Sequence, residues 1–103
     1  MNNFQNLLKQ AQKMQARVSQ MQAELADRRI EASAGGGMVT AIVNGKQELV
    51  ALKLEREVVN PDDVEMLEDL ILAAVNEAMG RAGELAAEEM RKITGGMSLP
   101  GLL

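Results

Sequence analysis

Basic side chains with a regular spacing stand near the start of this chain. Lys9, Lys13 and Arg17 follow one another at intervals of four residues, and no acid occurs before Glu24. On a helix, residues four apart lie on one face, and successive charges advance by about 6 Å. No acid stands three or four positions from any of them to neutralise it. The spacing suits a row of phosphates along a nucleic-acid strand, and a solvated basic face is the alternative that the residues alone leave open.

The charge of the chain is distributed unevenly. Its 103 residues carry a net charge of −4, but residues 1–29 carry +3 and residues 30–103 carry −7. Such asymmetry says more about partners than the total charge does. It adds Arg28 and Arg29 to the candidate DNA-binding residues. The single aromatic residue, Phe4, gives no platform for stacking unpaired bases, so the duplex backbone is the target we expect.

Several kinds of chemistry are excluded by composition. Without cysteine or histidine there is no disulfide, thiolate nucleophile, Cys/His zinc site or histidine base. The glycines at 35–37 precede a strand pattern and lack a following Lys-Ser/Thr pair, which predicts a turn rather than a phosphate-binding loop. Neighbouring carboxylates on a helix diverge by 100°, so we predict no catalytic site, metal or cofactor from the three acidic pairs: Asp62/Asp63, Glu68/Asp69 and Glu88/Glu89.

No membrane segment is expected either. No apolar run approaches the roughly 18 residues of a membrane span, and no charged leader precedes an apolar stretch. We therefore expect a soluble, cytoplasmic protein that is not an enzyme.

A helical repeat dominates residues 4–29. Neither glycine nor proline interrupts it, and glutamines fill much of the polar surface. Such spacing is typical of a coiled-coil seam or an antiparallel helix pair. The apolar positions alternate at intervals of three and four: Phe4, Leu7, Ala11, Met14, Val18, Met21 and Leu25.

Three strands are predicted next, at 30–34, 38–43 and 46–54. Asn44-Gly45 is a strong signal for a two-residue hairpin turn, so we expect a three-stranded antiparallel meander. Both faces of this sheet look at least partly covered. A two-residue turn would place five apolar residues on one face (Val39, Ala41, Val43, Val50 and Leu52) and four on the other (Met38, Ile42, Leu49 and Ala51).

A second long helix is expected from Asn60-Pro61 to Thr94, with Asn60 as its cap and Gly95-Gly96 as its end. Gly80 and Gly83 are expected to loosen this helix. The order is α-β-β-β-α, an α+β fold, with a single domain at 1–96 and an extended apolar tail at 97–103. A core this poor in large side chains favours a homodimer that shares it.

Several segments together resemble the YbaB/EbfC family of nucleoid-associated proteins, in the family's order and over nearly the whole chain. They are Lys-Gln-Ala-Gln-Lys-Met-Gln at 9–15, Gly-Met-Val at 37–39, Val-Asn-Gly at 43–45, Met-Leu-Glu-Asp-Leu at 66–70, Ala-Ala-Val-Asn-Glu-Ala at 73–78 and Gly-Gly-Met-Ser-Leu-Pro-Gly at 95–101.

The resemblance implies a tweezer-shaped homodimer with protruding helices. It implies a cytoplasmic, nucleoid-associated protein that binds double-stranded DNA and changes its conformation, with roles in nucleoid organisation and gene regulation. From this family we carry over the basic first helix, at Lys9, Lys13 and Arg17. The alternative is a dimeric adaptor that recruits protein partners through its amphipathic helices. Recombination or replication proteins as further partners are left open by the sequence.

Overall fold

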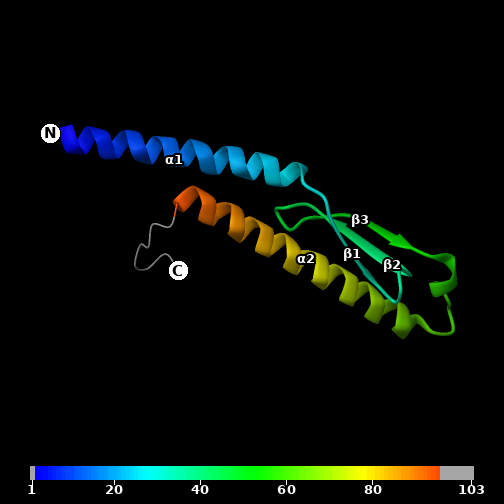
Figure 1. Ribbon diagram of the computed structural model, residues 1–103. Coiled ribbons are helices and arrows are strands. Elements are labelled where there is room, and N and C mark those ends of the chain that lie inside the picture. Colours follow the sequence, from blue (N-terminus) through cyan, green and yellow to red (C-terminus); the bar gives the residue numbers. More distant parts are fainter. Residues whose placement is uncertain (1, 96–103) are drawn as a thin grey trace.

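Two long helices and a small sheet make up an elongated molecule. The computed structural model describes residues 2–95, and its extents are 72 × 25 × 16 Å. The order confirms the expected α+β fold, whereas the tail at 97–103 lies outside the described residues. The elements (Figure 1) are α1 (Asn2–Asp27), β1 (Ile30–Ala34), β2 (Val39–Val43), β3 (Leu49–Leu54), the short 3-10 helix η1 (Arg56–Val58) and α2 (Val64–Thr94).

The core lies between α2 and two of the three strands. The strands are antiparallel in the order β1-β2-β3, and α2 packs against β1 and β2. Ala74, Ala78 and Ala82 are fully buried at four-residue intervals on α2, and their small size lets the helix approach the sheet closely. Val39 and Val43 of β2 are buried beneath them.

The third strand remains at an uncovered edge. In the observed register Ala41 pairs with Leu52, and Val39 pairs with Leu54, so both leucines share the side of the buried β2 residues. Nevertheless Leu52 is 37% exposed and Leu54 is 39% exposed, because α2 covers only β1 and β2.

The opposite face of the sheet carries Ser33 and Thr40, whose hydroxyls are joined by a hydrogen bond of 3.0 Å, and also the apolar residues Ile42 and Ala51. Thr40, Ile42 and Ala51 on this face are half-buried, in keeping with the expectation that both faces are at least partly covered.

The connection between β2 and β3 is longer than the predicted two-residue turn. Asn44, only 7% exposed, accepts hydrogen bonds through its side-chain oxygen from the backbone amides of Lys46 (2.9 Å) and Glu48 (3.0 Å). Its amide group donates to the Glu48 carboxylate at 2.8 Å. The Asn44 side chain thus accepts hydrogen bonds from two loop amides, where a tight turn would use backbone carbonyls as acceptors. Strand β3 consequently begins at Leu49.

A bulge follows from this longer loop. It lies between Ile42 and Val43, and Val43 pairs with Leu49 while Ile42 pairs with Ala51. Val50 is therefore the extra residue. Leu49, which the sequence placed on the other face of the sheet, lies opposite Val43 in the observed register.

The loop also fastens the sheet to the end of α1. The backbone amide of Gly45 donates to the carbonyl of Leu25 at 2.8 Å, and a side chain at Gly45 would stand 2.8 Å from that oxygen. Only glycine permits this approach. The arm formed by α1 is thereby attached to the sheet at Leu25.

The residue that caps α2 lies three residues later in the chain than the sequence predicts. Asn60 accepts from the amide of Asp62 at 3.0 Å and so shapes a turn around Pro61. Asp63 is the residue that caps α2, accepting from the amide of Met66 at 3.2 Å. At the other end Gly95 has a left-handed conformation and donates to the Arg91 carbonyl, as expected for a helix ending at Thr94.

The two glycines inside α2 differ in their surroundings. The side-chain nitrogen of Gln47 crosses Gly83 to donate to the carbonyl of Met79 at 2.9 Å, and a side chain at Gly83 would stand 2.9 Å from that nitrogen. Gly80 has no atom within 4 Å of where its side chain would begin. Gly83 therefore makes room for the loop between β2 and β3, which the expectation of a loosened helix missed.

We expect Gly80→Ala to stabilise the protein and Gly83→Ala to give no such gain. The first removes a helix-interior glycine from open space, worth about 1 kcal/mol and about 4–8 °C in Tm. The second introduces the same alanine but displaces the Gln47 hydrogen bond. Thermal unfolding at one protein concentration measures both. In a Gln47→Ala background the two alanine substitutions should become equivalent; a persistent difference would show that Gln47 is not the cause.

Candidate nucleic-acid interface

The basic row of α1 lies on a helix that extends well beyond the sheet. Lys9, Lys13 and Arg17 are all exposed. Towards its C-terminal end α1 runs antiparallel to α2 (Figure 1), and Met21 and Leu25 are buried there. The row therefore occupies the arm, and its carboxyl end approaches the last turns of α2.

Two of the three bases border a groove between the helices. Lys13 and Arg17 line an open groove of about 380 Å³, together with Gln10, Met14, Ile93, Thr94 and Gly95. Lys9 does not line it, and lies a further turn along α1. Lys13 and Arg17 thus flank the apolar seam at Met14, whereas the sequence placed the basic row roughly opposite the seam.

The structure brings one further basic residue, Lys92, beside Arg17. Arg91 and Lys92 occupy the last turn of α2. Lys92 and Arg17 together line a second open groove of about 290 Å³, which Glu24 and Glu89 also border. Sequence reasoning missed both α2 residues, since bases in a last helical turn are expected anyway from the helix dipole. Only the antiparallel pairing of α1 and α2 shows that Lys92 extends the basic row.

Arg28 and Arg29 have different surroundings from the row. Arg29 donates from its guanidinium group to the carbonyls of Ala26 and Arg28, both at 3.1 Å, and so satisfies the end of α1. Arg28 lines a small recess beside Glu24 and Glu89. Both follow the end of α1 at Asp27, which lies about 15 Å along the helix axis from Arg17. The structure does not bring them together with Lys9 and Lys13.

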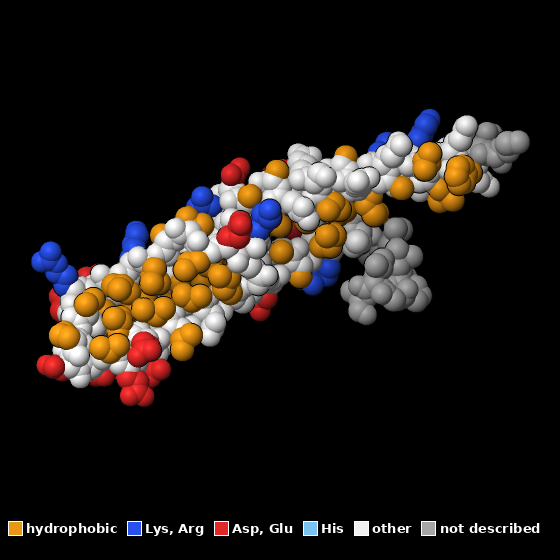
Figure 2. All heavy atoms as spheres, turned by 180° about the vertical axis from the view of Figure 1, so that it is seen from behind, with side chains coloured by type: hydrophobic (Ala, Val, Ile, Leu, Met, Phe, Trp, Pro, Cys, Tyr) orange, Lys and Arg blue, Asp and Glu red, His pale blue; other side chains and the backbone are white. Residues whose placement is uncertain are grey.

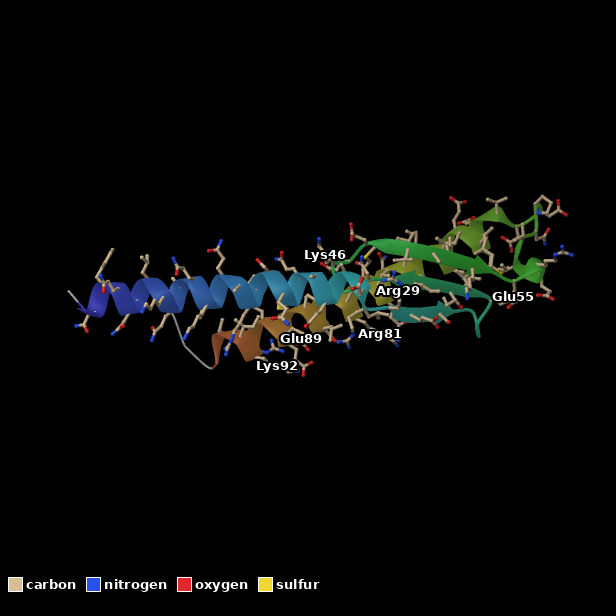
Figure 3. The ribbon with its side chains drawn as sticks, turned by 90° about the horizontal axis from the view of Figure 1, so that it is seen from above. Arg29, Lys46, Glu55, Arg81, Glu89 and Lys92 are labelled. Atoms are coloured by element: carbon tan, nitrogen blue, oxygen red, sulfur yellow. The ribbon has the colours of Figure 1, made fainter. Side chains whose placement is uncertain are left out.

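The α1 bases keep their charge exposed. Within residues 2–95 the ion pairs are Arg81 with Glu77 at 2.9 Å and Lys92 with Glu89 at 3.2 Å, and both lie within α2. Figure 3 labels Arg81, Glu89 and Lys92. Exposed pairs of this kind contribute little stability. None of the α1 bases takes part in an ion pair within that range, so their full charge faces solvent.

Acidic residues gather at the other end of the molecule. Residues 55–69, which include η1 and the first turns of α2, hold seven acids and one base. Acidic side chains stand around an apolar surface at this sheet end (Figure 2). Across the described part of the chain, no three acidic side chains come together as a metal site, and no helix there is long and apolar enough to span a membrane.

The basic arm, held apart from the acidic sheet end, is suited to binding polyanions. The model of the YbaB/EbfC DNA-binding family matches residues 1–97. The chain belongs to this family, as the resemblance indicated.

Similar proteins extend over almost the whole chain. A nucleoid-associated protein of Thermoanaerobacter pseudethanolicus is 55% identical over 97% of this chain and 90% of its own. One of Clostridium novyi is 54% identical over 97% of this chain and 88% of its own. In structure the chain is similar to an uncharacterized protein of Helicobacter pylori, with a TM-score of 0.82, 25% identity and coverage of 89% of this chain and 97% of that one.

Proposed function

We propose that this protein binds the phosphate backbone of double-stranded DNA through the row Lys9, Lys13 and Arg17, extended by Arg91 and Lys92 of α2. The observation that carries this proposal is the row itself: three exposed bases at four-residue spacing, outside every ion pair of the described residues. Phosphate contacts of this kind fix position without reading base sequence. Membership of a DNA-binding family supports DNA as the polyanion.

The active species is a homodimer that presents two such arms. Support comes from the uncovered apolar edge of the sheet, where Leu49, Leu52 and Leu54 remain exposed around the incompletely covered core. Hydrophobic side chains form a continuous surface over this end of the molecule (Figure 2). An exposed apolar surface of this kind on a small domain favours association with a second copy of the same chain. A second copy packed there leaves both α1 arms projecting.

The protein acts by binding and not by catalysis, in the cytoplasm and on the nucleoid. Two arms that grip one duplex alter its conformation, which serves nucleoid organisation and gene regulation. The nucleoid-associated names of relatives from Thermoanaerobacter and Clostridium support this location.

Fluorescence anisotropy of a random-sequence duplex, titrated with the protein at about 50 and about 200 mM salt, tests the proposal. We expect saturable binding that is independent of sequence and weakens steeply between the two conditions. Absence of binding even at the lower salt would overturn it.

A protein adaptor is the second candidate, because the N-terminal half of α1 leaves large apolar side chains exposed. It predicts that a protein partner is retained when the three bases are replaced by alanine, and that the chain does not bind DNA at 200 mM salt. Binding at about 50 mM salt that is lost in the triple alanine variant would favour the DNA function, and a protein partner retained by that variant would favour the adaptor.

A further inference from the structure

An apolar stripe on the N-terminal half of α1 has no neighbour among residues 2–95. Phe4 is 70% exposed and Leu7 is 64% exposed, and Leu8 is exposed beside them. Farther along the same helix, Met21 and Leu25 are buried. The stripe runs from Phe4 through Leu7 and Ala11 to the half-buried Met14. Large apolar side chains on one face of a helix indicate a surface that is covered by something else.

Helix α2 ends beside Met14, the residue of this stripe that lies nearest the sheet. Gly95 and Met14 line the same open groove of about 380 Å³, together with Ile93. Gly95 has a φ of 58°, which ends the helix and turns the backbone away from its axis. The described part of the chain therefore ends beside Met14.

The segment that follows has the composition to cover the stripe. Residues 96–103 are Gly-Met-Ser-Leu-Pro-Gly-Leu-Leu, with four large apolar side chains and no charged side chain. Proline at position 100 opposes a helix there and favours an extended chain. An uncharged, apolar segment next to an uncovered apolar stripe is matched to it in chemistry.

The length of segment 96–103 also matches the length of the stripe on α1. Two residues of extended chain advance about 6.6 Å, and four residues of α-helix rise about 6 Å. The stripe residues stand three or four residues apart, a rise of about 4.5–6 Å, so alternate residues of an extended segment stay close to successive residues of the stripe. A chain extended along α1 from Gly95 would place Met97 near Ala11 and Leu99 near Leu7. The remaining leucines reach the neighbourhood of Phe4.

We propose that segment 96–103 lies along α1 from Met14 towards Phe4 and covers the apolar stripe of its own chain. In this position it supports the arm where no other element reaches. It leaves the charged ends of Lys9 and Lys13 exposed, because Lys9 lies on the opposite side of the helix and Lys13 lies at the edge of the stripe. The proposal concerns how the arm is held and does not depend on DNA as the ligand.

A cysteine pair tests the placement directly, since the chain contains no cysteine of its own. We expect Leu7→Cys combined with Leu99→Cys to form a disulfide within one chain under mild oxidation. The matched control is Gln5→Cys with Leu99→Cys, because Gln5 is rotated about 160° from Leu7 around the helix. A control that cross-links equally well would overturn the proposal. So would cross-linking of the first pair only between chains, which would assign the stripe to a second copy.

Amide hydrogen exchange tests the same placement without introduced cysteines. In a chain that ends at Gly96, we expect residues 4–12 to exchange on the order of tenfold faster than in the full chain, with residues 20–25 unchanged. Leu99→Ser with Leu102→Ser should reproduce the effect at full length, and Ser98→Ala should not. Exchange in residues 4–12 that is insensitive to truncation would contradict the proposal.

Discussion

Replacing Lys9, Lys13 and Arg17 together by alanine should remove most of the affinity for duplex DNA on all sequences alike. The three bases are exposed and, within the described chain, outside any ion pair, so their charge is available to phosphates. Each phosphate contact contributes about 0.9 to the slope of log K against log salt. Two arms with three contacts each therefore make the slope shallower by about 5. At 0.1 M salt we expect at least about a hundredfold loss.

A matched variant separates this effect from the general change in charge. Lys46→Ala, Lys53→Ala and Arg56→Ala together remove the same three charges, but from the sheet and the loops that adjoin it. We expect a small loss of affinity and an almost unchanged salt slope, measured by anisotropy. Equal slopes for the two triple variants would remove the α1 row from the interface.

Leu52→Glu should prevent formation of the proposed homodimer. Leu52 lies on the uncovered apolar side of β3, and a carboxylate without a partner there opposes burial against a second copy. Light scattering after gel filtration should show the mass of one chain in place of two. Loss of the second arm also abolishes bivalent binding, so we expect DNA affinity to fall on the order of a hundredfold.

The neighbouring residue supplies the control. Lys53 is on the same strand but points to the opposite, polar face. Lys53→Glu changes the charge by more than Leu52→Glu does, and we expect it to leave the mass at two chains. Circular dichroism should show that both variants remain folded, since both side chains are exposed. A Leu52→Glu protein that keeps the mass of two chains would exclude β3 from the interface.

Local patterns were sufficient to predict the elements of this fold. The apolar repeat predicted 4–29 as a helix, and it is observed at Asn2–Asp27. The strands and the helix end at Thr94 were also close to the predictions. What could not be predicted depended on contacts between distant residues. The hairpin loop follows the Asn44 network and the approach of Gly45 to Leu25, and neither is visible in the turn dipeptide.

The candidate site was predictable on one helix only. The row on α1 follows from the four-residue spacing, because residues of one helix have fixed relative positions. Lys92 stands 75 residues from Arg17 in sequence, and only the packing of α1 on α2 brings them to one groove. Gly83 was misinterpreted for the same reason: the side chain that needs its space, Gln47, belongs to another element.

The elongated shape explains how a chain with a net charge of −4 can approach a polyanion. The acids of residues 55–69 and the bases of the arm lie at opposite ends of a molecule whose longest extent is 72 Å. At physiological ionic strength the Debye length is about 8 Å. Several Debye lengths therefore separate the acidic end from a duplex at the arm, and its repulsion is largely screened. What remains is an electric dipole that turns the arm towards DNA before contact.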